Sequence, residues 1–252
     1  MQSIYIGPKW HYLMKNNITT TDLLLSGFQL FQDEREFKFS IDAILLAHFG
    51  TVKQNKHYLE LGTGTGVIPH VLYHRGARHV VGVDCNPRVI ELAQKSVLHN
   101  GIAEAVSMVE LDYMSDAGKV YYGQFDGIYM NPPYFEPQSG LLSEEESVAL
   151  ALHEQRYTMK DILLQAQRYL KFGGTLWMIY TTPRLESLVS AIEQTQFRIK
   201  RMRFIHGNQD KVSKLVLLEL KYGGKQGMLV EPPLYVYDVD GSYSDEVQAY
   251  YE

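Results

Sequence analysis

The stretch His57-Tyr-Leu-Glu-Leu-Gly-Thr-Gly-Thr-Gly66 decides the fold of this chain. Residues 57–61 are mostly apolar or aromatic and predict a short buried strand. The three glycines that follow predict a tight turn, because glycine adopts backbone angles that other residues avoid. The next segment, Val67-Ile-Pro-His-Val-Leu-Tyr-His74, predicts a helix. A strand that leads through a glycine turn into a helix opens a βα unit, whose turn can lie close to a ligand.

Strands and helices go on alternating after this unit. This alternation predicts an α/β fold with a mostly parallel, seven-stranded sheet and helices on both faces. In such sheets ligands bind beyond the carboxyl ends of the strands, so the residues after the first four strands should form the site. The further strands are predicted over residues 79–83, 105–109, 125–130, 175–180, 197–205 and 214–220, and the helices over 87–99, 159–170 (ending near Gly173 and Gly174) and 183–194.

We predict one domain for the whole chain, residues 1–252, since no repeat or Pro/Gly linker divides it. Its first part, residues 1–50, should be an irregular aromatic cap followed by a helix over 43–49, with Asp42 as the N-cap. The sheet and its helices should occupy residues 51–225. The tyrosine-rich tail, residues 226–252, should cover the sheet.

The composition excludes several classes of protein. Of the 252 residues, 45% are hydrophobic and 21% charged, which is typical of a globular chain and not of a disordered one. No apolar run approaches the roughly 18 residues that a membrane helix needs, and the start lacks the pattern of a signal peptide. The single cysteine, Cys85, excludes a disulfide framework and indicates a reducing, cytoplasmic location. His70 and His74 lie one helical turn apart without a third ligand nearby, so we predict no metal site.

Charge is unevenly distributed along the chain, whose net charge is −5. Residues 198–225 hold eight basic and two acidic side chains, whereas residues 226–252 hold six acidic and no basic ones. The basic segment is compatible with contacts to phosphate groups, and the alternative is a solvated pair of strands.

The spacing of the glycines narrows the choice of ligand. A dinucleotide fingerprint would need its third glycine at position 67, which is Val67, and no Lys-Ser/Thr follows as in a P-loop. The pattern of an acid followed by three alternating glycines resembles the first motif of the S-adenosylmethionine-dependent methyltransferases, which implies a Rossmann-like class I fold. The resemblance implies that Glu60 contacts the ammonium end of S-adenosyl-L-methionine, directly or through water. It also implies that the backbone passes beside the cofactor at three positions: Gly62, Gly64 and Gly66.

Two acids follow the second and third strands. A carboxylate at Asp84 can accept hydrogen bonds from both hydroxyls of a ribose, and the alternative role is an N-cap for the helix at Pro87. The resemblance assigns Asp84 to the cofactor ribose and Asp112 to the cofactor adenine amino group. An exposed loop acid is the alternative for Asp112, and Glu110 replaces it if the third strand ends two residues earlier.

The fourth predicted strand runs directly into Asn131-Pro-Pro-Tyr134-Phe135. Two prolines fix two φ angles and remove two backbone donors, so this corner is stiff and offers acceptor oxygens. The Asn131 side-chain oxygen and the Pro132 carbonyl could hold an amino group whose lone pair is delocalised, and direct displacement then needs mainly positioning. Tyr134 would stack on the planar acceptor, and Phe135 would extend that wall as a substrate contact. A rigid turn with buried aromatics is the alternative.

Those four residues match the motif of methyltransferases that act on adenine N6, guanine N2 or a protein glutamine. Flanking segments resemble the bacterial valine tRNA adenine-N6 methyltransferases, which act on an adenine beside the anticodon, and this resemblance spans about residues 25–252. The segments that carry it are Phe37-Lys-Phe-Ser-Ile-Asp-Ala-Ile-Leu-Leu46, Asn131–Phe135, Ala151-Leu-His153-Glu154 and the tail from Pro232 to Glu246.

The resemblance therefore implies a tRNA partner and N6 methylation of an adenine in the anticodon region. Arg201 and Arg203, in the basic segment, would follow the RNA phosphates. His153 would either approach the base or begin a helix. Ribosomal RNA guanine or protein glutamine remain alternative acceptors, although about 55 residues before the first strand leave little room for the helical domain of the glutamine enzymes. A non-catalytic RNA-binding protein is the third possibility, and the sequence predicts no oligomeric state.

Overall fold

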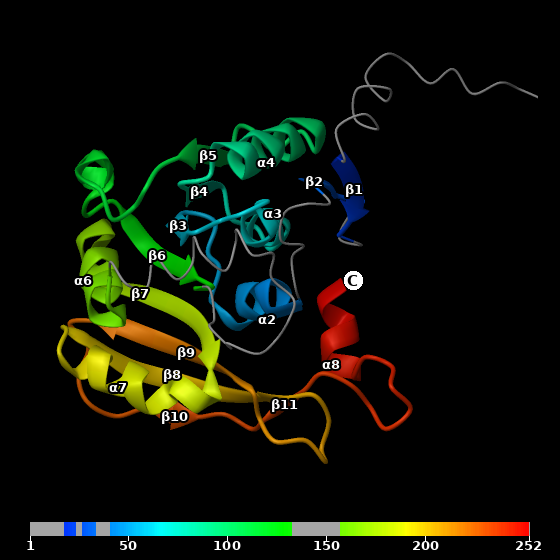
Figure 1. Ribbon diagram of the computed structural model, residues 1–252, viewed down its shortest axis with the longest axis vertical. Helices are drawn as coiled ribbons and strands as arrows, with labels where there is room; N and C mark the ends of the chain where they lie inside the picture. The colour runs from blue at the N-terminus through cyan, green and yellow to red at the C-terminus, as the bar shows by residue number, and fades with distance from the viewer. Residues whose placement is uncertain (1–17, 24–26, 34–40, 133–156, 252) are drawn as a thin grey trace, which may run out of the picture.

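A computed structural model describes residues 18–23, 27–33, 41–132 and 157–251 of the chain (Figure 1). The main sheet has the strand order β10-β8-β9-β7-β6-β3-β4-β5, with β11 also paired to β8. Every pairing in it is parallel except those of β9. The seven predicted strands are β3 (His57–Leu61), β4 (His79–Asp84), β5 (Val106–Glu110), β6 (Phe125–Met130), β7 (Leu170–Thr181), β8 (Phe197–His206) and β9 (Leu215–Tyr222). The tail adds two short ones, β10 (Leu229–Val230) and β11 (Leu234–Tyr235).

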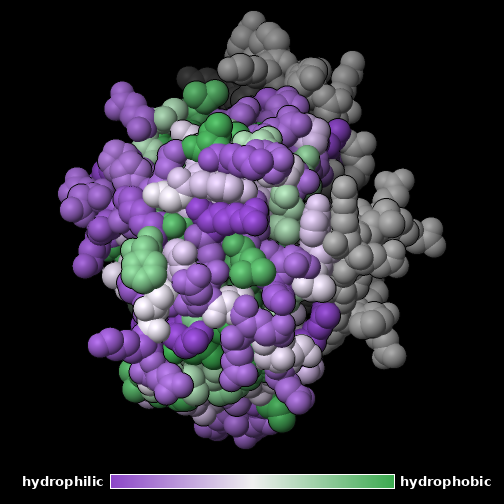
Figure 2. Space-filling model, turned by 90° about the vertical axis from the view of Figure 1, so that its left-hand side faces the viewer, coloured by the Kyte–Doolittle hydropathy of each residue, from purple (hydrophilic) through white to green (hydrophobic). Residues whose placement is uncertain are grey.

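Helices cover both faces of this sheet, as the alternation predicts (Figure 1). One face packs against α2 (Ile41–Phe49), α3 (Val67–His74) and α4 (Pro87–His99). The other packs against α6 (Met159–Tyr169) and α7 (Leu185–Glu193), and the 3-10 helix η1 (Asp116–Tyr121) lies near them. Figure 2 views the molecule from the side of α6 and α7, where the surface is mostly hydrophilic and apolar side chains form separate small patches.

Several predicted boundaries differ from the structure by one to a few residues, and two of the differences have a clear local cause. Asp42 lies in the first turn of α2 and is not its N-cap, because the helix already begins at Ile41. The strand after α6 begins at Leu170, without the gap predicted from Gly173 and Gly174. The register against β6 shifts in this region, and Gly173 has a φ of 79°, so the glycines mark an irregularity inside β7.

The start of the described chain is a hairpin and not the irregular cap that the sequence predicts. β1 (Ile18–Asp22) and β2 (Gln29–Asp33) pair antiparallel, and β2 packs along α4. The amide of Phe31 donates to the Ser96 hydroxyl at 2.9 Å, and Asp33 forms an ion pair with Arg88. The hairpin is therefore bound to the helix that follows β4.

The tail extends the sheet and then crosses to another element. After β11 it forms α8 (Asp245–Gln248) and the 3-10 helix η3 (Ala249–Tyr251), which end beside α2 (Figure 1). The Tyr250 ring stacks on the His48 ring of α2, with the ring centroids 4.4 Å apart. The prediction that the tail covers the sheet therefore needs correction, because its β10 and β11 widen the sheet at one edge.

Candidate active site

The strand register brings the predicted site residues into one row. Leu61, the last residue of β3, pairs with Met130 of β6 and with Val83 of β4. Asp84 in turn pairs with Glu110 of β5. Four site residues therefore stand side by side at the carboxyl edge of the sheet. In the order of the strands they are Asn131 after β6, Gly62 after β3, Asp84 at the end of β4 and Asp112 after β5.

The turn after β3 has the backbone that only glycine adopts without strain. Gly62, Gly64 and Gly66 have φ angles of 73°, 52° and 83°, in the left-handed region. A Cβ added at Gly62 or Gly64 would meet nothing within 4 Å, so both positions border open space. A Cβ at Gly66 would lie 2.6 Å from the Met108 side chain, because the start of α3 packs tightly there. The first two glycines thus face outward and the third is needed for packing.

Glu60 lies behind this turn and is only 3% exposed. Its carboxylate accepts a short hydrogen bond from the Thr63 hydroxyl. Burial raises its pKa well above the ordinary value, the Thr63 hydrogen bond opposes that shift, and the charge of Asp84 adds to it. In the part of the chain that the structure describes, no cation forms an ion pair with Glu60. Thr63 is a site residue that the glycine motif does not predict, although a hydroxyl three residues after a buried acid is a usable signal.

Asp84 holds the glycine turn through its carboxylate. Its Oδ2 accepts the Gly64 amide at 2.9 Å and its Oδ1 accepts the Asn86 amide at 3.0 Å. The alternative role as N-cap of α4 is wrong, because the Asn86 side chain accepts the Arg88 amide at 3.0 Å and caps the helix. Asp84 is half-buried, so its carboxylate both braces the turn and reaches solvent.

Asp112 follows the end of β5 and lies on the same side of the row as Asp84. Its Oδ1 accepts the Met114 amide at 2.9 Å. Glu110 is the last residue of β5, so the early strand end that would favour Glu110 does not occur. Burial and the nearby carboxylates of Asp84 and Asp112 raise the pKa of the Cys85 thiol, which places both acids beside this exposed cysteine.

Asn131 and Pro132 follow β6 directly, with Asn131 partly exposed and Pro132 buried. Strand β6 is fixed by packing just before them, because the buried Tyr129 ring stacks on Trp177 of β7 with centroids 4.9 Å apart. Trp177 is itself fixed by a 3.0 Å hydrogen bond from its indole nitrogen to Glu219. The corner therefore begins from a rigid strand end. The predicted residues Tyr134, Phe135 and His153 lie outside the described residues.

Arg201 does not belong to this row. It lies in β8, where its guanidinium donates to Glu219 at 3.1 Å, to Glu231 of the tail at 3.0 Å and to the Phe49 carbonyl at 2.6 Å. It also lies over the Phe49 ring, 4.1 Å from the centroid. Its donors are thus engaged within the chain.

Arg203 is held in the same way by the tail. It forms a two-pronged ion pair with Glu246 at 2.5 and 2.7 Å and donates to the Pro232 carbonyl at 2.9 Å. Here a residue of the acidic tail and a residue of the basic segment form an ion pair. This geometry argues against free phosphate contacts by either arginine, because their donors already have partners.

The residues of the row fit a cofactor with an ammonium group and a ribose. Open space beside Gly62 and Gly64, a buried carboxylate at Glu60 without a cation and a half-exposed carboxylate at Asp84 are complementary to such a molecule. Within residues 18–23, 27–33, 41–132 and 157–251, no group of three or more His, Cys, Asp or Glu is placed to hold a metal ion. The described helices also include none that is long and apolar enough to cross a membrane.

Known proteins resemble this chain in sequence and in fold. Residues 40–205 match the family described as methyltransferase small domain. A tRNA1(Val) (adenine(37)-N6)-methyltransferase of Actinobacillus pleuropneumoniae is 28% identical, with the alignment covering 87% of this chain and 92% of that protein. A "Putative protein N5-glutamine methyltransferase" of Methanocaldococcus jannaschii is also 28% identical and covers 71% of this chain and 86% of its own length. Among solved structures, a predicted O-methyltransferase of Agrobacterium tumefaciens shares the fold, with a TM-score of 0.66 at 19% identity over 83% of this chain and 95% of that one.

Proposed function

The chain belongs to the methyltransferase small domain family and uses S-adenosylmethionine, and we propose that it methylates N6 of an adenine in tRNA, in the anticodon region. One observation carries the proposal. The pairing of Leu61 with Met130 makes Asn131 the direct neighbour of the glycine turn, where the methyl donor would lie. Relatives named as tRNA adenine-N6 methyltransferases, which align with most of this chain, support the choice of acceptor.

The proposed cofactor contacts come from the carboxyl edge of the sheet. We assign Glu60 to the ammonium group, Asp84 to the ribose hydroxyls and Asp112 to the adenine amino group. Gly62 and Gly64, which border open space, let the backbone approach closely, and Gly66 lets the start of α3 pack against Met108. When bound, S-adenosylmethionine supplies a methyl group on a positively charged sulfur.

The proposed catalytic work is positioning. An aromatic amino group is a weak nucleophile because its lone pair is delocalised into the ring. The Asn131 side-chain oxygen and the Pro132 carbonyl would each accept one N–H of that amino group, which directs its nitrogen toward the methyl donor. Tyr134 would stack on the base and Phe135 would extend the stacking surface. The proton leaves after transfer, so no strong base is required.

An anticodon-loop adenine suits this corner because the acceptor must leave its stack before it can reach the site. Bases in loops cost less to unstack than bases inside a duplex. Arg201 and Arg203 are not part of the proposed RNA surface, since each forms an ion pair with a glutamate of the tail.

A protein glutamine is the second candidate acceptor. The similarity to the archaeal protein named for N5-glutamine methylation favours it, and an amide nitrogen presents the same two N–H groups to Asn131 and Pro132.

Identification of the methylated nitrogen tests the proposal. The protein is incubated with isotope-labelled S-adenosylmethionine and, in separate reactions, with bacterial tRNA, ribosomal RNA and a protein extract. Mass spectrometry of the digests should find the label as N6-methyladenosine in tRNA. Label in a glutamine side chain or in ribosomal guanine would replace the proposed acceptor, and no label in any fraction would contradict it.

A further inference from the structure

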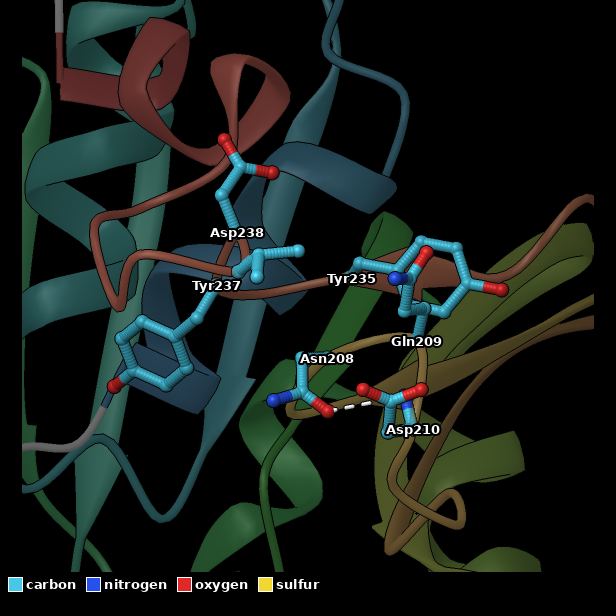
Figure 3. A pocket seen from close by; sticks show the side chains of 7 residues that line it. Asn208, Gln209, Asp210, Tyr235, Tyr237 and Asp238 are labelled. Carbon is cyan, nitrogen blue, oxygen red and sulfur yellow. Dashed lines mark hydrogen bonds between the residues drawn. The ribbon is translucent and has the colours of Figure 1, made fainter.

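A small pocket lies at the end of β8, away from the row of site residues. It has a volume of about 120 Å³ and forms where the loop between β8 and β9 meets the end of β11 and the residues that follow it. Figure 3 shows the residues that line it, which include Asn208 and Asp210 of the loop and Tyr235, Tyr237 and Asp238 of the tail. We call it the tyrosine pocket. None of its residues enters the proposed methyl transfer.

The tyrosine pocket opens at the same edge of the sheet as the candidate active site. β8 runs parallel to β7, because both pair antiparallel with β9. The end of β7 touches the β8–β9 loop, since the Thr182 amide donates to the Lys214 carbonyl at 2.9 Å. Three strand spacings separate β8 from β6, which is roughly 14 Å across the sheet. A single-stranded RNA a few nucleotides long can span that distance.

The pocket has the side chains that bind single-stranded RNA. Tyr235 and Tyr237 are 38% and 41% exposed, and one face of the Tyr237 ring stacks on Tyr243 with the centroids 5.4 Å apart. Aromatic side chains with solvent access are platforms for unstacked bases. The carboxylates of Asp210 and Asp238 accept N–H groups, which the edges of nucleobases donate. The exposed Lys211 lies in the same loop and can attract phosphate groups.

Hydrogen bonds of backbone and side chains also hold the pocket in a fixed shape. The tail is tied to the loop by the Tyr237 amide, which donates to the Gly207 carbonyl at 2.8 Å. Within the loop, the Asp210 amide donates to the Asn208 side chain at 3.1 Å, and the His206 ring contacts the Lys211 carbonyl at 2.7 Å. A preformed site loses less conformational entropy when it binds.

We propose that the tyrosine pocket binds a second unstacked nucleobase of the RNA substrate, a few nucleotides from the methylated one. This inference rests on the proposed function, because it assumes an RNA acceptor. It assigns to the tail a role in substrate affinity, which the acids of the tail alone would not suggest. A base with N–H donors, such as guanine, matches the two carboxylates.

Steady-state methylation of transcribed valine tRNA tests the pocket. Tyr235→Ala should raise KM for tRNA about 10-fold and leave kcat within about twofold, because base stacking on an aromatic ring is lost. Tyr235→Phe should behave like the wild type, since the ring remains. Phe172→Ala is the matched control, because Phe172 is a 76% exposed aromatic residue of β7 at the opposite end of its strand. Circular dichroism and Tm confirm that each variant folds, and Asn208→Ala replaces Tyr235→Ala if that variant does not.

Asp238→Asn separates recognition of a base from repulsion of phosphates. A carboxylate that accepts base N–H groups predicts a higher KM for this variant, whereas a carboxylate that only repels RNA predicts a lower one, and the second result would overturn the proposal. An unchanged KM in Tyr235→Ala and Tyr237→Ala, with tRNA methylated normally, would show that the tyrosine pocket does not bind a nucleobase. The proposed function would then remain intact. If the wild type methylates no RNA, both fail together.

Discussion

The acidic residues at the two edges of the sheet have different hydrogen-bond partners. At the amino edge, Asp126 of β6 accepts hydrogen bonds from Lys56 at 2.8 Å, from Lys171 at 2.9 Å and from the His57 amide at 3.1 Å. At the carboxyl edge, Asp84 of β4 accepts two backbone amides, and no ion pair joins it to a cation within the described residues. The same residue type is thus paired with lysines at one edge and bonded to backbone amides at the other.

The difference separates acidic residues that stabilise the fold from acidic residues that can bind a ligand. Partial burial alone would raise the pKa of Asp126, but the hydrogen bonds from Lys56 and Lys171 outweigh it and hold the pKa well below its ordinary value. Its charge is satisfied within the protein. Asp84 has only amide donors and no lysine or arginine partner within the described residues, so a donor group of a ligand can still bind it. The contrast predicts that substitutions at the carboxyl edge change function and those at the amino edge change stability.

The largest expected effect is that of Asn131→Ala at the carboxyl edge. Loss of one acceptor leaves the amino group misplaced, and we expect kcat to fall at least about 100-fold. Cofactor affinity, measured by calorimetry with S-adenosylhomocysteine, should stay within about threefold, because Asn131 is assigned to the acceptor. A collapse of cofactor affinity with normal turnover of the bound enzyme would show that Asn131 has another role.

The pair Asp84→Asn and Asp126→Asn tests the comparison directly. Asp84→Asn should weaken cofactor binding about 10- to 100-fold, since hydrogen bonds to a charged acceptor are lost. Asp126→Asn should leave cofactor binding unchanged and reduce the free energy of unfolding by about 1–2 kcal/mol, because its lysines are partly exposed. Calorimetry and urea denaturation of both variants check the two expectations. If both variants lose cofactor affinity equally, the two edges are not functionally distinct.

The pH dependence of stability follows from the same contrast. A group whose pKa is lower in the folded than in the unfolded protein adds stability above its unfolded pKa, which is near 3.8 for an aspartate. That contribution is lost as the pH falls from there through the folded value. Asp126→Asn should therefore flatten the decline of the free energy of unfolding in this acidic range. Asp84→Asn serves as the control.

Arg201→Met tests whether the charges of β8 belong to structure or to RNA binding. It removes the cation that pairs with both Glu231 and Glu219, and we expect a loss of about 1–3 kcal/mol in unfolding free energy, because all three side chains are only partly exposed. The salt dependence of tRNA affinity should stay as in the wild type. Arg198→Met is the control, since its guanidinium donates to the backbone carbonyls of Thr195 and Phe197. A flatter salt dependence of tRNA affinity with unchanged stability would indicate that Arg201 contacts RNA.

The smallest effect is expected at Glu60, through pH. Burial raises its pKa, so Glu60 takes up a proton at a higher pH than an ordinary glutamate does. Cofactor affinity should therefore decrease as the pH falls, because a neutral side chain attracts an ammonium group less. Glu60→Gln should bind more weakly and show a flatter pH profile in calorimetry. An unchanged profile in that variant would assign the pH dependence to another group.

The local elements could be predicted closely from the sequence. β3, α3, α4 and β6 begin and end at the predicted residues, because apolar periodicity, the three glycines and the proline at the start of α4 are local signals. The hairpin β1–β2 was missed, because its second strand is stabilised by α4, about 65–71 residues away in sequence. Propensity within a short segment carries no information about such a partner.

The sequence by itself determined the glycine turn after β3 and the proline-braced Asn131 after β6, since φ preferences are properties of each residue and its neighbours. Only the tertiary structure decided which charges remain for a ligand. Arg201 meets Glu231 and the Phe49 carbonyl, 30 and 152 residues away, and is withdrawn from RNA binding by them. An ion pair depends on a separation of a few ångströms in space, and the number of residues between its partners does not set that separation.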